Sequence, residues 1–427
     1  MILRDPVHGL VAFESEEDAI VTRVLECPEV QRLRRIRQLG LTSFAFPGAE
    51  HTRFSHALGA AHVMQRFVAR LRRIDGDLPF WQRVTSERAR DVIVAALLHD
   101  LGHGPLSHLF EEAVPNAPPH EWWTRRILLD PSTGVHRCLS QDDPNLPTRV
   151  ADLVEGKHEL PYLAHAVSGV FDVDRCDYLL RDAHSTGVTY GAFDLDWLLR
   201  SLRFDVAAGP DAPGLAIDGM KGVTAIESFL LARLFMFQQV YFHKSTRAAE
   251  WMIRAIVRRA VDLLRDGTPL PARLPTLESV AAGVEPTLAD YLELDDGILL
   301  GAMHAWEDAS DPALADLCKR LRARSLFKTI ELGGVESDVD PTSALEIARD
   351  VAKQAGLDPD VMVGLDRAED TPFPHDAGLR VLFPDGRAKD LSEVSFLLAR
   401  LHGQTLSRVR LVFAPELRAR LREALAS

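Results

Sequence analysis

The 427-residue sequence has few cysteines, and the features that mark exported or membrane proteins are missing from it. Its four cysteines, Cys27, Cys138, Cys176 and Cys318, are far apart and form no Cys-X-X-Cys pair, so neither a thiolate zinc site nor a disulfide framework is indicated. The N-terminal segment lacks the apolar core of a signal peptide, and the apolar run 92–98 is too short to span a bilayer. We therefore expect a cytoplasmic protein without membrane insertion.

The sequence also lacks an excess of positive charge. Its formal net charge is −13, which argues against stable nucleic-acid binding, because that needs a basic surface; a local basic pocket could still hold a polyanion. With 46% apolar and 26% charged residues, the composition is that of an ordinary globular protein. A chain of this length is longer than a single hydrophobic core usually accommodates, so we expect more than one structural region. We expect a catalytic region at 1–325, with its core at about 50–185, and a smaller region at 326–427.

Apolar residues recur at helical spacing through most of the chain, which predicts a mainly α fold with a few short strands. The segments with this spacing are 17–37, 54–74, 87–101, 121–129, 147–155, 160–168, 174–184, 220–264, 288–304 and 311–324.

Short extended segments are expected near the N-terminus, at Ile2–Leu3 and Leu10–Phe13, and at Leu202–Phe204 and Leu215–Ile217 around a turn-rich loop, 206–214. The segment 265–287 is expected to be a flexible connection. Beyond it the pattern is mixed and predicts a small α+β unit. Its expected strands are Leu326–Glu331 and Val409–Phe413, and its expected helices are Ala344–Ala355 and Pro415–Ala426.

Histidines are crowded into one part of the sequence. Seven of the 16 histidines lie between residues 51 and 120, namely His51, His56, His62, His99, His103, His108 and His120. A single histidine is usually an ordinary core or surface residue, but imidazole also binds transition metals and transfers protons near neutral pH. The crowding therefore favours a chemical role for this region.

The adjacent pair His99–Asp100 follows an apolar helical run and could supply two ligands to one cation. Farther along, Asp174, Tyr178 and Asp182 lie four residues apart and so share one helix face. Each stretch alone also has an explanation without a metal. The pair His99–Asp100 could simply end a helix before Gly102, and the second stretch could be a solvated, salt-bridged helix.

Taken in order along the chain, these stretches resemble the HD-domain phosphohydrolases, and among them the deoxynucleoside triphosphate triphosphohydrolases, without their sterile-alpha-motif domain. The resemblance covers roughly the first three quarters, and the last 100 residues show no clear match. It is carried by the motifs Asp5–Gly9, Val30–Gly40, Phe46–His56, Leu98–His108, His120–Glu121, Asp172–Asp182, Gly187–Gly191, Tyr241–Lys244 and Arg324–Lys328.

The resemblance implies a metal site and a set of proton-transfer residues. The implied metal ligands are His56, His99, Asp100 and Asp174. Two imidazoles and two carboxylates suit Fe, Mn, Zn or Ni, and Mg could accompany the nucleotide. The implied catalytic residues are His120, His103 and His108, with Glu111 and Glu121 to orient imidazoles.

For the substrate, the resemblance implies a deoxynucleoside triphosphate (dNTP), hydrolysed at the α-phosphorus to deoxynucleoside and triphosphate. Residues that match the triphosphate contacts are Arg53, Arg175, Tyr178 and Arg233. Residues that match the sugar pocket are Gln38, Leu39, Asp182 and Tyr241. In that pocket the Tyr241 ring would exclude a 2′-hydroxyl.

Many members of this family are oligomers that nucleotides activate, so the resemblance also implies a homodimer or homotetramer with GTP or dNTP activators. Residues that match a guanine-nucleotide activator site are Glu26, Gln31, Arg34, Arg324 and Lys328. A second activator site is matched by Lys221, His243 and Lys244. That second match is incomplete, because Gly219 and Ala225 stand where an Arg and an Asn are typical.

Two other functions fit the same residues. The metal ligands and arginines could serve a nucleotide phosphatase, or a phosphodiesterase that acts on other nucleotides or short nucleic acids. The chain could also be an inactive nucleotide sensor or a nucleic-acid-binding module. Triphosphate release, orthophosphate or monophosphate release, and binding without turnover would separate the three.

Overall fold

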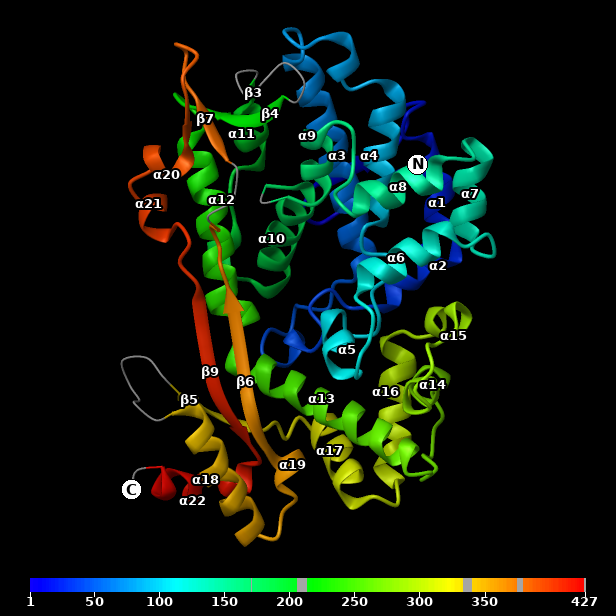
Figure 1. Cartoon of the computed structure of the whole chain (residues 1–427), viewed down its shortest axis with the longest axis vertical. Helices are drawn as coiled ribbons and strands as arrows, with labels where there is room; N and C mark the ends of the chain where they lie inside the picture. The colour runs from blue at the N-terminus through cyan, green and yellow to red at the C-terminus, as the bar shows by residue number, and fades with distance from the viewer. Residues whose placement is uncertain (170, 206–212, 333–339, 375–378, 426–427) are drawn as a thin grey trace.

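The computed structural model describes residues 1–169, 171–205, 213–332, 340–374 and 379–425. The molecule is elongated, with the N-terminal helices at one side and the C-terminal segment running along the other (Figure 1). As predicted, the fold is mainly helical, with a few small sheets.

The first half of the chain is a cluster of helices preceded by one hairpin. Strands β1 and β2 pair antiparallel, with Leu3 opposite Val11, which confirms the two predicted N-terminal strands. The elements are β1 (Ile2–Asp5), β2 (Gly9–Ala12), α1 (Ala19–Leu25), α2 (Pro28–Arg32), α3 (Arg53–Ile74), α4 (Ser86–Leu98), α5 (His108–Ala113), α6 (His120–Leu129), α7 (Gly134–Asp142), α8 (Leu146–Val154), α9 (Pro161–Val167), α10 (Val173–Thr186) and α11 (Leu195–Arg200).

Most predicted helices of this half are confirmed within two residues, and two are wrong in part. The run 17–37 is broken, because Pro28 starts a new helix, α2, and the last residues form a 3-10 turn. The run 87–101 ends early, at Leu98. Helix α10 begins with the Asp172 side chain accepting from the Arg175 backbone N–H and ends at Gly187, whose φ of 74° is left-handed.

The next part continues as helices around a short strand pair. Leu202 lies opposite Ile217, so the predicted pair is confirmed, although most of the loop 206–214 lies outside the described residues. The elements are β3 (Leu202–Asp205), β4 (Gly214–Asp218), α12 (Val223–Met236), the π-helical turn Phe237–Tyr241, α13 (Lys244–Arg265), α14 (Pro275–Ala281), α15 (Leu288–Leu292), α16 (Asp296–Ala305) and α17 (Pro312–Arg322).

Two expectations for this part are wrong. The segment 265–287 is not a simple flexible connection, because it contains α14, whose Leu277 is buried together with Leu274. The run 288–304 is divided into α15 and α16, because Asp295 caps a new helix by accepting from the Ile298 backbone N–H.

The last part contains the expected α+β unit. Strand β9 lies between β5 and β6, with Phe413 opposite both Lys328 and Val363. The elements are β5 (Lys328–Leu332), α18 (Pro341–Gln354), α19 (Pro359–Met362), β6 (Val363–Asp370), β7 (Arg380–Leu382), β8 (Ala388–Asp390), α20 (Leu391–Val394), α21 (Leu398–Leu401), β9 (Leu406–Phe413) and α22 (Arg418–Ala424). Strand β7 pairs in parallel with β4, so this part also extends the sheet of the middle region.

One described segment, Val223–Tyr241, is long and apolar enough to cross a membrane by length and composition. In the fold, 44% of its apolar window is buried, and Ile226, Phe229 and Leu230 belong to the hydrophobic core. The segment packs here as a core helix.

Candidate active site

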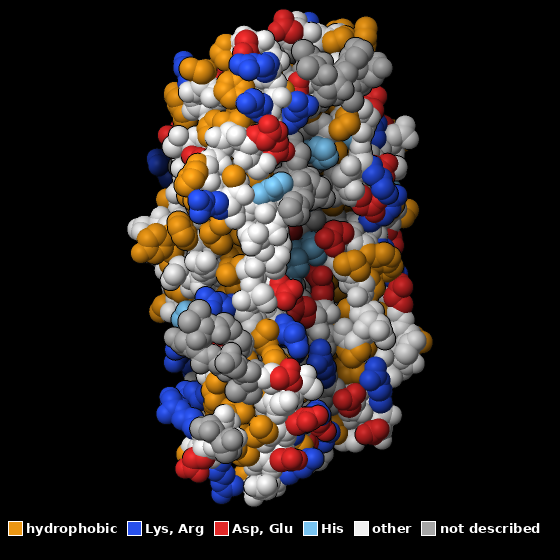
Figure 2. All heavy atoms as spheres, turned by 60° about the vertical axis from the view of Figure 1, so that its left-hand side comes forward, with side chains coloured by type: hydrophobic (Ala, Val, Ile, Leu, Met, Phe, Trp, Pro, Cys, Tyr) orange, Lys and Arg blue, Asp and Glu red, His pale blue; other side chains and the backbone are white. Residues whose placement is uncertain are grey.

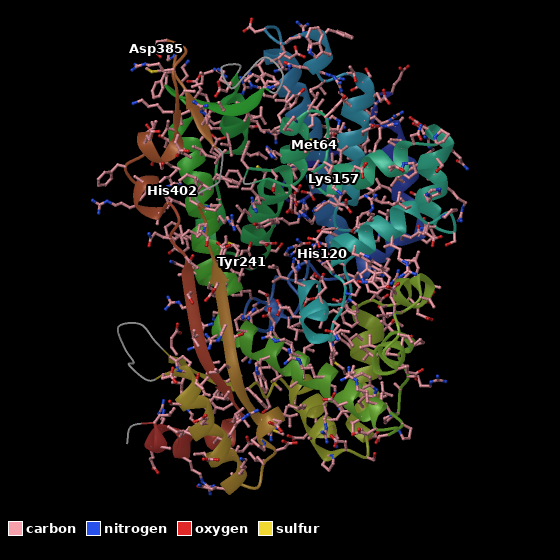
Figure 3. The ribbon with its side chains drawn as sticks, in the orientation of Figure 1. Met64, His120, Lys157, Tyr241, Asp385 and His402 are labelled. Carbon is pink, nitrogen blue, oxygen red and sulfur yellow. The ribbon has the colours of Figure 1, made fainter. Side chains whose placement is uncertain are left out.

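A cavity of about 1100 Å³ lies between the helices of the first half and the end of α12. Figure 2 shows a hollow in the middle of one face, with histidine and acidic side chains inside it. His120, at the start of α6, and Tyr241, at the end of the π-helical turn, lie on either side of this region (Figure 3). The cavity therefore brings together parts of the chain that are far apart in sequence.

Three predicted metal ligands, His99, Asp100 and Asp174, line this cavity, and the fourth, His56, is completely buried beside them. His56 comes from α3, His99 and Asp100 follow α4, and Asp174 lies in the first turn of α10. The Nε2 atoms of His56 and His99 are 3.3 Å apart, and Asp174 Oδ1 lies 2.9 Å from His56 Nε2 and 3.5 Å from His99 Nε2. The Asp100 carboxylate lies 3.4 Å from His99 Nε2 and 3.5 Å from His56 Nε2.

The other ring nitrogens show which atoms are free to bind a metal. His56 Nδ1 lies 2.8 Å from Asp177 Oδ2, and His99 Nδ1 lies 2.9 Å from the Ala96 carbonyl oxygen. Since these oxygens accept hydrogen bonds, each Nδ1 carries a proton, which leaves each Nε2 to present its lone pair when a metal takes the place of a second proton. Two lone pairs that face each other beside carboxylates repel unless a cation lies between them. The donor set therefore fits a divalent cation.

The surrounding charges keep the carboxylates ionised. Burial raises the pKa of Asp174. Without a cation, however, Nε2 of His56 and of His99 can hold a proton, and the resulting hydrogen bonds and positive charge hold the pKa of Asp174 below its ordinary value. Burial also raises the pKa of Asp100, but the positive charge of Arg53 and the interactions with His99 and His103 together outweigh it, so the net shift is strongly downward. Both side chains are ready to act as anionic ligands.

Gly102 allows the histidines to approach one another. A Cβ atom there would lie 2.1 Å from the His120 carbonyl oxygen and 2.4 Å from the Thr124 backbone nitrogen. The Gly102 N–H donates to Thr124 Oγ1 at 2.9 Å. The close contact holds the start of α6, and with it His120, beside the turn that carries His99.

Arg53 is held at the cavity by a strained turn. Its Nη1 donates to the Asp100 carboxylate, and its Nε donates to Ser107 Oγ at 2.9 Å. Leu106 and Ser107 have φ values of 57° and 63°, which non-glycine residues rarely adopt. Ser107 is a site residue that sequence reasoning missed, and the sequence offers no signal for it.

The predicted proton-transfer residues form one cluster. The rings of His103 and His120 stack, with centroids 3.7 Å apart and an angle of 15°, and the His108 ring lies edge-on to both. His103 Nδ1 and His120 Nδ1 lie 3.4 and 3.1 Å from Glu111 Oε1, and Glu121 lies 3.4 Å from His120 Nδ1. Burial lowers the pKa of His103 to about 3, so this ring is neutral.

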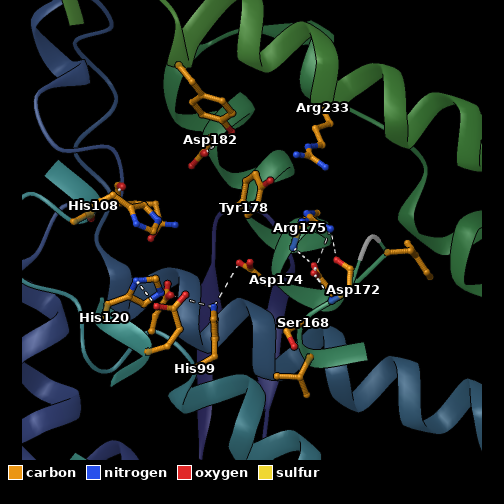
Figure 4. Close-up of a pocket in the computed structure, with 18 of the residues that line it drawn as sticks. His99, His108, His120, Ser168, Asp172, Asp174, Arg175, Tyr178, Asp182 and Arg233 are labelled. Atoms are coloured by element: carbon orange, nitrogen blue, oxygen red, sulfur yellow. Dashed lines mark hydrogen bonds and ion pairs between the residues drawn. The ribbon is translucent and has the colours of Figure 1, made fainter. Parts of the chain in front are cut away.

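The predicted substrate residues line the same cavity. Arg175, Tyr178 and Arg233 lie across it from His108 and His120 (Figure 4). The Tyr241 hydroxyl donates to Asp182 Oδ2 at 2.8 Å. Gln38 and Leu39 are also in the lining.

Two contacts on these residues were not anticipated. His51 Nε2 lies 2.7 Å from Asp182 Oδ1, so Asp182 has partners on both oxygens. Arg233 Nη2 donates to Asp370 Oδ1 at 2.6 Å, and Asp370 belongs to β6 in the C-terminal part.

A buried network behind the metal ligands was also missed. Asp177 accepts from Arg181 and, besides the His56 ring, lies 2.6 Å from His8 Nε2. Arg181 Nη1 donates to Asp5 Oδ2 at 2.7 Å. The spacing of Asp177 and Arg181 on one helix, with the Asp5–His8 motif, was the available signal.

The predicted activator residues are outside this cavity, within the part of the chain that the structure describes. Gln31 Oε1 accepts from Arg34 Nε at 2.8 Å, and Arg324 Nε donates to the Phe44 carbonyl oxygen at 3.1 Å. The other members are Glu26, which follows α1, Lys221, which precedes α12, His243 and Lys244 at the start of α13, and Lys328 at the start of β5.

Comparisons with known proteins agree with the fold and place the candidate metal ligands within a recognised domain. The HD domain family matches residues 53–182, and the HD associated region matches residues 193–273. The uncharacterized protein YwfO of Bacillus subtilis is 35% identical over 424 residues, which cover 97% of this chain and 92% of YwfO. The crystal structure of a phosphohydrolase from Bacteroides thetaiotaomicron has a TM-score of 0.81 at 27% identity, covering 97% of this chain and 99% of that one.

More distant similarity extends to enzymes named for their substrate. Human deoxynucleoside triphosphate triphosphohydrolase SAMHD1 is 26% identical over 382 residues, which cover 82% of this chain but 57% of the human enzyme. The HD domain match, the phosphohydrolase structure and the match to YwfO over nearly the whole chain concur. The chain is a member of the HD-domain phosphohydrolases that carry an HD associated region.

Proposed function

We propose that this phosphohydrolase converts dNTPs to deoxynucleosides and inorganic triphosphate. One observation carries the proposal: a single cavity contains the metal donors, a histidine–glutamate cluster, arginines suited to phosphate, and an aspartate–tyrosine pair suited to a deoxyribose. The similarity to the SAMHD1 enzymes supports the same substrate class.

His56, His99, Asp100 and Asp174 are the residues that would hold the cation, which we take to be Fe, Mn, Zn or Ni. When bound, such a cation supplies Lewis-acid chemistry, lowering the pKa of water and polarising phosphoryl oxygens. Mg could accompany the triphosphate.

The reaction is the attack of water on the α-phosphorus with cleavage of the bond to the 5′-oxygen. Arg53, Arg175 and Arg233 stabilise the negative charge on the phosphoryl oxygens. Glu111 stays ionised, because, although burial raises its pKa, the imidazoles of His103 and His120, whose Nδ1 atoms face its carboxylate, lower it further. Glu111 accepts a hydrogen bond from Nδ1–H of a doubly protonated His120, and Nε2–H of that ring gives its proton to the departing oxygen, which leaves the ring neutral.

The sugar is bound at the other side of the cavity. Asp182 accepts a hydrogen bond from the 3′-hydroxyl. Gln38 also bonds to this hydroxyl, and its Oε1 atom is buried without a hydrogen-bond partner among the described residues. The ring of Tyr241, tied to Asp182, occupies the space that a 2′-hydroxyl needs. The site therefore prefers deoxyribose.

Activation belongs to the proposal as well. GTP or a dNTP binds Glu26, Gln31, Arg34, Arg324 and Lys328, and a second nucleotide binds Lys221, His243 and Lys244, in a homo-oligomer. Light scattering after size-exclusion chromatography, with and without GTP, measures the assembly. Hyperbolic dNTP kinetics that GTP leaves unchanged would count against activation.

Product analysis tests the main proposal. Each dNTP is incubated with Mg, Mn, Fe or Co, and the products are separated by ion-exchange chromatography. Deoxynucleoside and triphosphate in equal amounts support it, and His99→Ala and Asp100→Ala should abolish them with an unchanged circular dichroism spectrum. Orthophosphate or nucleoside monophosphate would identify a phosphatase or phosphodiesterase, and tight binding without turnover would identify a sensor.

A further inference from the structure

A second group of metal-type donors lies beside the first and shares no residue with it. His103, His108 and His120 each direct a ring nitrogen toward Glu111, and one donor atom from each of the four residues lies within 4.8 Å of the others. The Nδ1 atoms are 3.4, 4.0 and 3.1 Å from Glu111 Oε1, in that order of histidines.

These separations match those between two ligands of one small cation. Zinc binds imidazole nitrogen and carboxylate oxygen at about 2.0–2.2 Å, so two ligands of a tetrahedral ion are about 3.4 Å apart. The separations of His103 and His120 from Glu111 lie close to this value, and that of His108 is somewhat longer. The His108 side chain is 63% exposed, so it can move the remaining distance.

The inner part of the cluster lacks hydrogen-bond partners. His103 is completely buried, and among the described residues neither of its ring nitrogens has a hydrogen-bond partner; the same holds for Glu111 Oε1. Leaving such groups unpaired costs free energy. A cation that binds both would satisfy them together.

The stacking of two rings favours a cation over extra protons. His103 and His120 lie face to face, and both direct Nδ1 toward the same carboxylate oxygen. Protonation of both rings would place two positive charges at the stacking distance of 3.7 Å, which repel. Neutral rings avoid this repulsion, and they share one cation through Nδ1 once they tilt out of the stack, because each Nδ1 lone pair lies in its ring plane.

We propose that His103, His108, His120 and Glu111 form a second metal site, which takes one transition-metal cation of the Zn²⁺ type. Three imidazoles and one carboxylate are a donor set that such cations prefer to Mg²⁺ or Ca²⁺. Asp100 Oδ1 lies 3.2 Å from His103 Nε2, so the two sites are adjacent and Asp100 faces both.

The second site has a consequence that rests on the proposed function. The same imidazoles transfer protons in the proposed reaction, and a ring nitrogen that binds a cation cannot do so. A protein with one cation at the first site is therefore active, and the second cation inhibits it.

Metal stoichiometry tests the site without depending on activity. Metal-free protein is titrated with Co²⁺ and Zn²⁺, and bound metal is measured by calorimetry and elemental analysis, with the visible absorption of Co²⁺ as a report of tetrahedral binding. Wild type should bind two equivalents, while His108→Ala and Glu111→Gln should bind one. Asp174→Asn should lose the other equivalent, and His304→Ala, an exposed histidine on α16, should retain both.

One equivalent in wild type, or two in Glu111→Gln and His108→Ala, would overturn the site. Because His108 is exposed, His108→Ala gives the answer even where Glu111→Gln does not fold, and circular dichroism checks both. In a parallel assay, triphosphate release should fall at the second Zn²⁺ equivalent. Two bound equivalents without any dNTP turnover would contradict the proposed function and leave the site standing.

Discussion

At the scale of single residues, the metal site depends on a side chain that binds no metal itself. Asp177 holds the proton on His56 Nδ1 and is buried completely. It also accepts from Arg181, which contacts Asp5 of the N-terminal hairpin. The hairpin therefore supports the orientation of a ligand that is about 50 residues away in sequence.

We expect Asp177→Asn to weaken metal binding by roughly 10- to 100-fold, the usual effect of removing such a supporting group. The amide can offer His56 Nδ1 its oxygen but lacks the charge that favours Nδ1–H. Calorimetric titration of metal-free protein measures the change. Asp196→Asn, which removes an exposed carboxylate paired with Arg66, is the control, and equal affinities in both variants would contradict the expectation.

Single residues also show what the sequence could reveal. His56, His99, Asp100 and Asp174 could be selected from their motifs, and the structure brings them together. Ser107 and His51 could not be selected, because their importance comes from contacts with Arg53 and Asp182 that only the folded chain makes.

At the scale of elements, the cavity is connected to the C-terminal part by the last residue of β6. Asp370 binds Arg233, both side chains are 10% exposed, and Arg233 Nε and Asp370 Oδ2 are buried without a hydrogen-bond partner among the described residues. The Arg233 guanidinium, which is expected to bind phosphate, therefore already donates one of its hydrogen bonds to a carboxylate.

We expect Asp370→Asn to lower the KM for a dNTP by roughly 3- to 10-fold, on the order of 1 kcal/mol, with a smaller change in kcat. The substitution removes a negative charge that competes with the triphosphate for Arg233. Steady-state kinetics measure the change in KM. The control is Glu369→Gln, which alters the neighbouring carboxylate that accepts a hydrogen bond from Ser407. A higher KM in Asp370→Asn would show that the carboxylate positions Arg233 instead.

Helix α13 carries a carboxyl group whose pKa predicts a pH effect. Burial raises the pKa of Glu250 from 4.5 to about 7, with Glu112 and Asp366 raising it and Arg247 and Arg254 opposing the rise. The folded protein therefore holds this proton more tightly than the unfolded chain. At pH values between the unfolded pKa of 4.5 and the folded pKa of about 7, the unfolded chain binds fewer protons than the folded protein. This group therefore lowers the free energy of unfolding as the pH rises.

We expect Glu250→Gln to remove this loss of stability with rising pH. The free energy of unfolding of the variant minus that of wild type should then be about 2 kcal/mol larger at pH 8 than at pH 5. Urea unfolding at both pH values measures the difference. Glu293→Gln, which changes a carboxyl group at the end of α15, is the matched control. A difference that stays constant with pH would contradict the expectation.

Elements could be predicted where one periodic pattern runs without interruption, as in α3. They could not be delimited where a local hydrogen bond starts a new helix inside the pattern. Asp295 and Pro28 are such places. His243 is another, because it caps α13 by accepting from the Ser245 backbone N–H directly after the π-helical turn Phe237–Tyr241, within one apolar pattern.

At the scale of the whole molecule, the division of the chain into regions is less simple than composition indicates. The expected C-terminal unit is present as the β5–β9–β6 sheet, yet β7 pairs with β4, with Val381 opposite Ile217. The ion pair between Asp370 of the C-terminal part and Arg233 of α12 likewise joins the two regions. Such pairings between distant segments leave no local pattern, so the boundary at residue 325 stays a prediction.

The metal ligands join three long helices, so the first cation should stabilise the whole fold. His56 is on α3, His99 follows α4 and Asp174 is on α10, and the unfolded chain does not hold these donors together. A ligand that binds the folded state alone contributes about 4 kcal/mol at a thousandfold excess over its Kd. We expect removal of the cation by EDTA to lower Tm by several degrees, measured by differential scanning calorimetry, and return of one equivalent to restore it. Asp174→Asn should show a smaller response to EDTA than wild type, since it has already lost a ligand; an equal response would place the stabilising cation elsewhere.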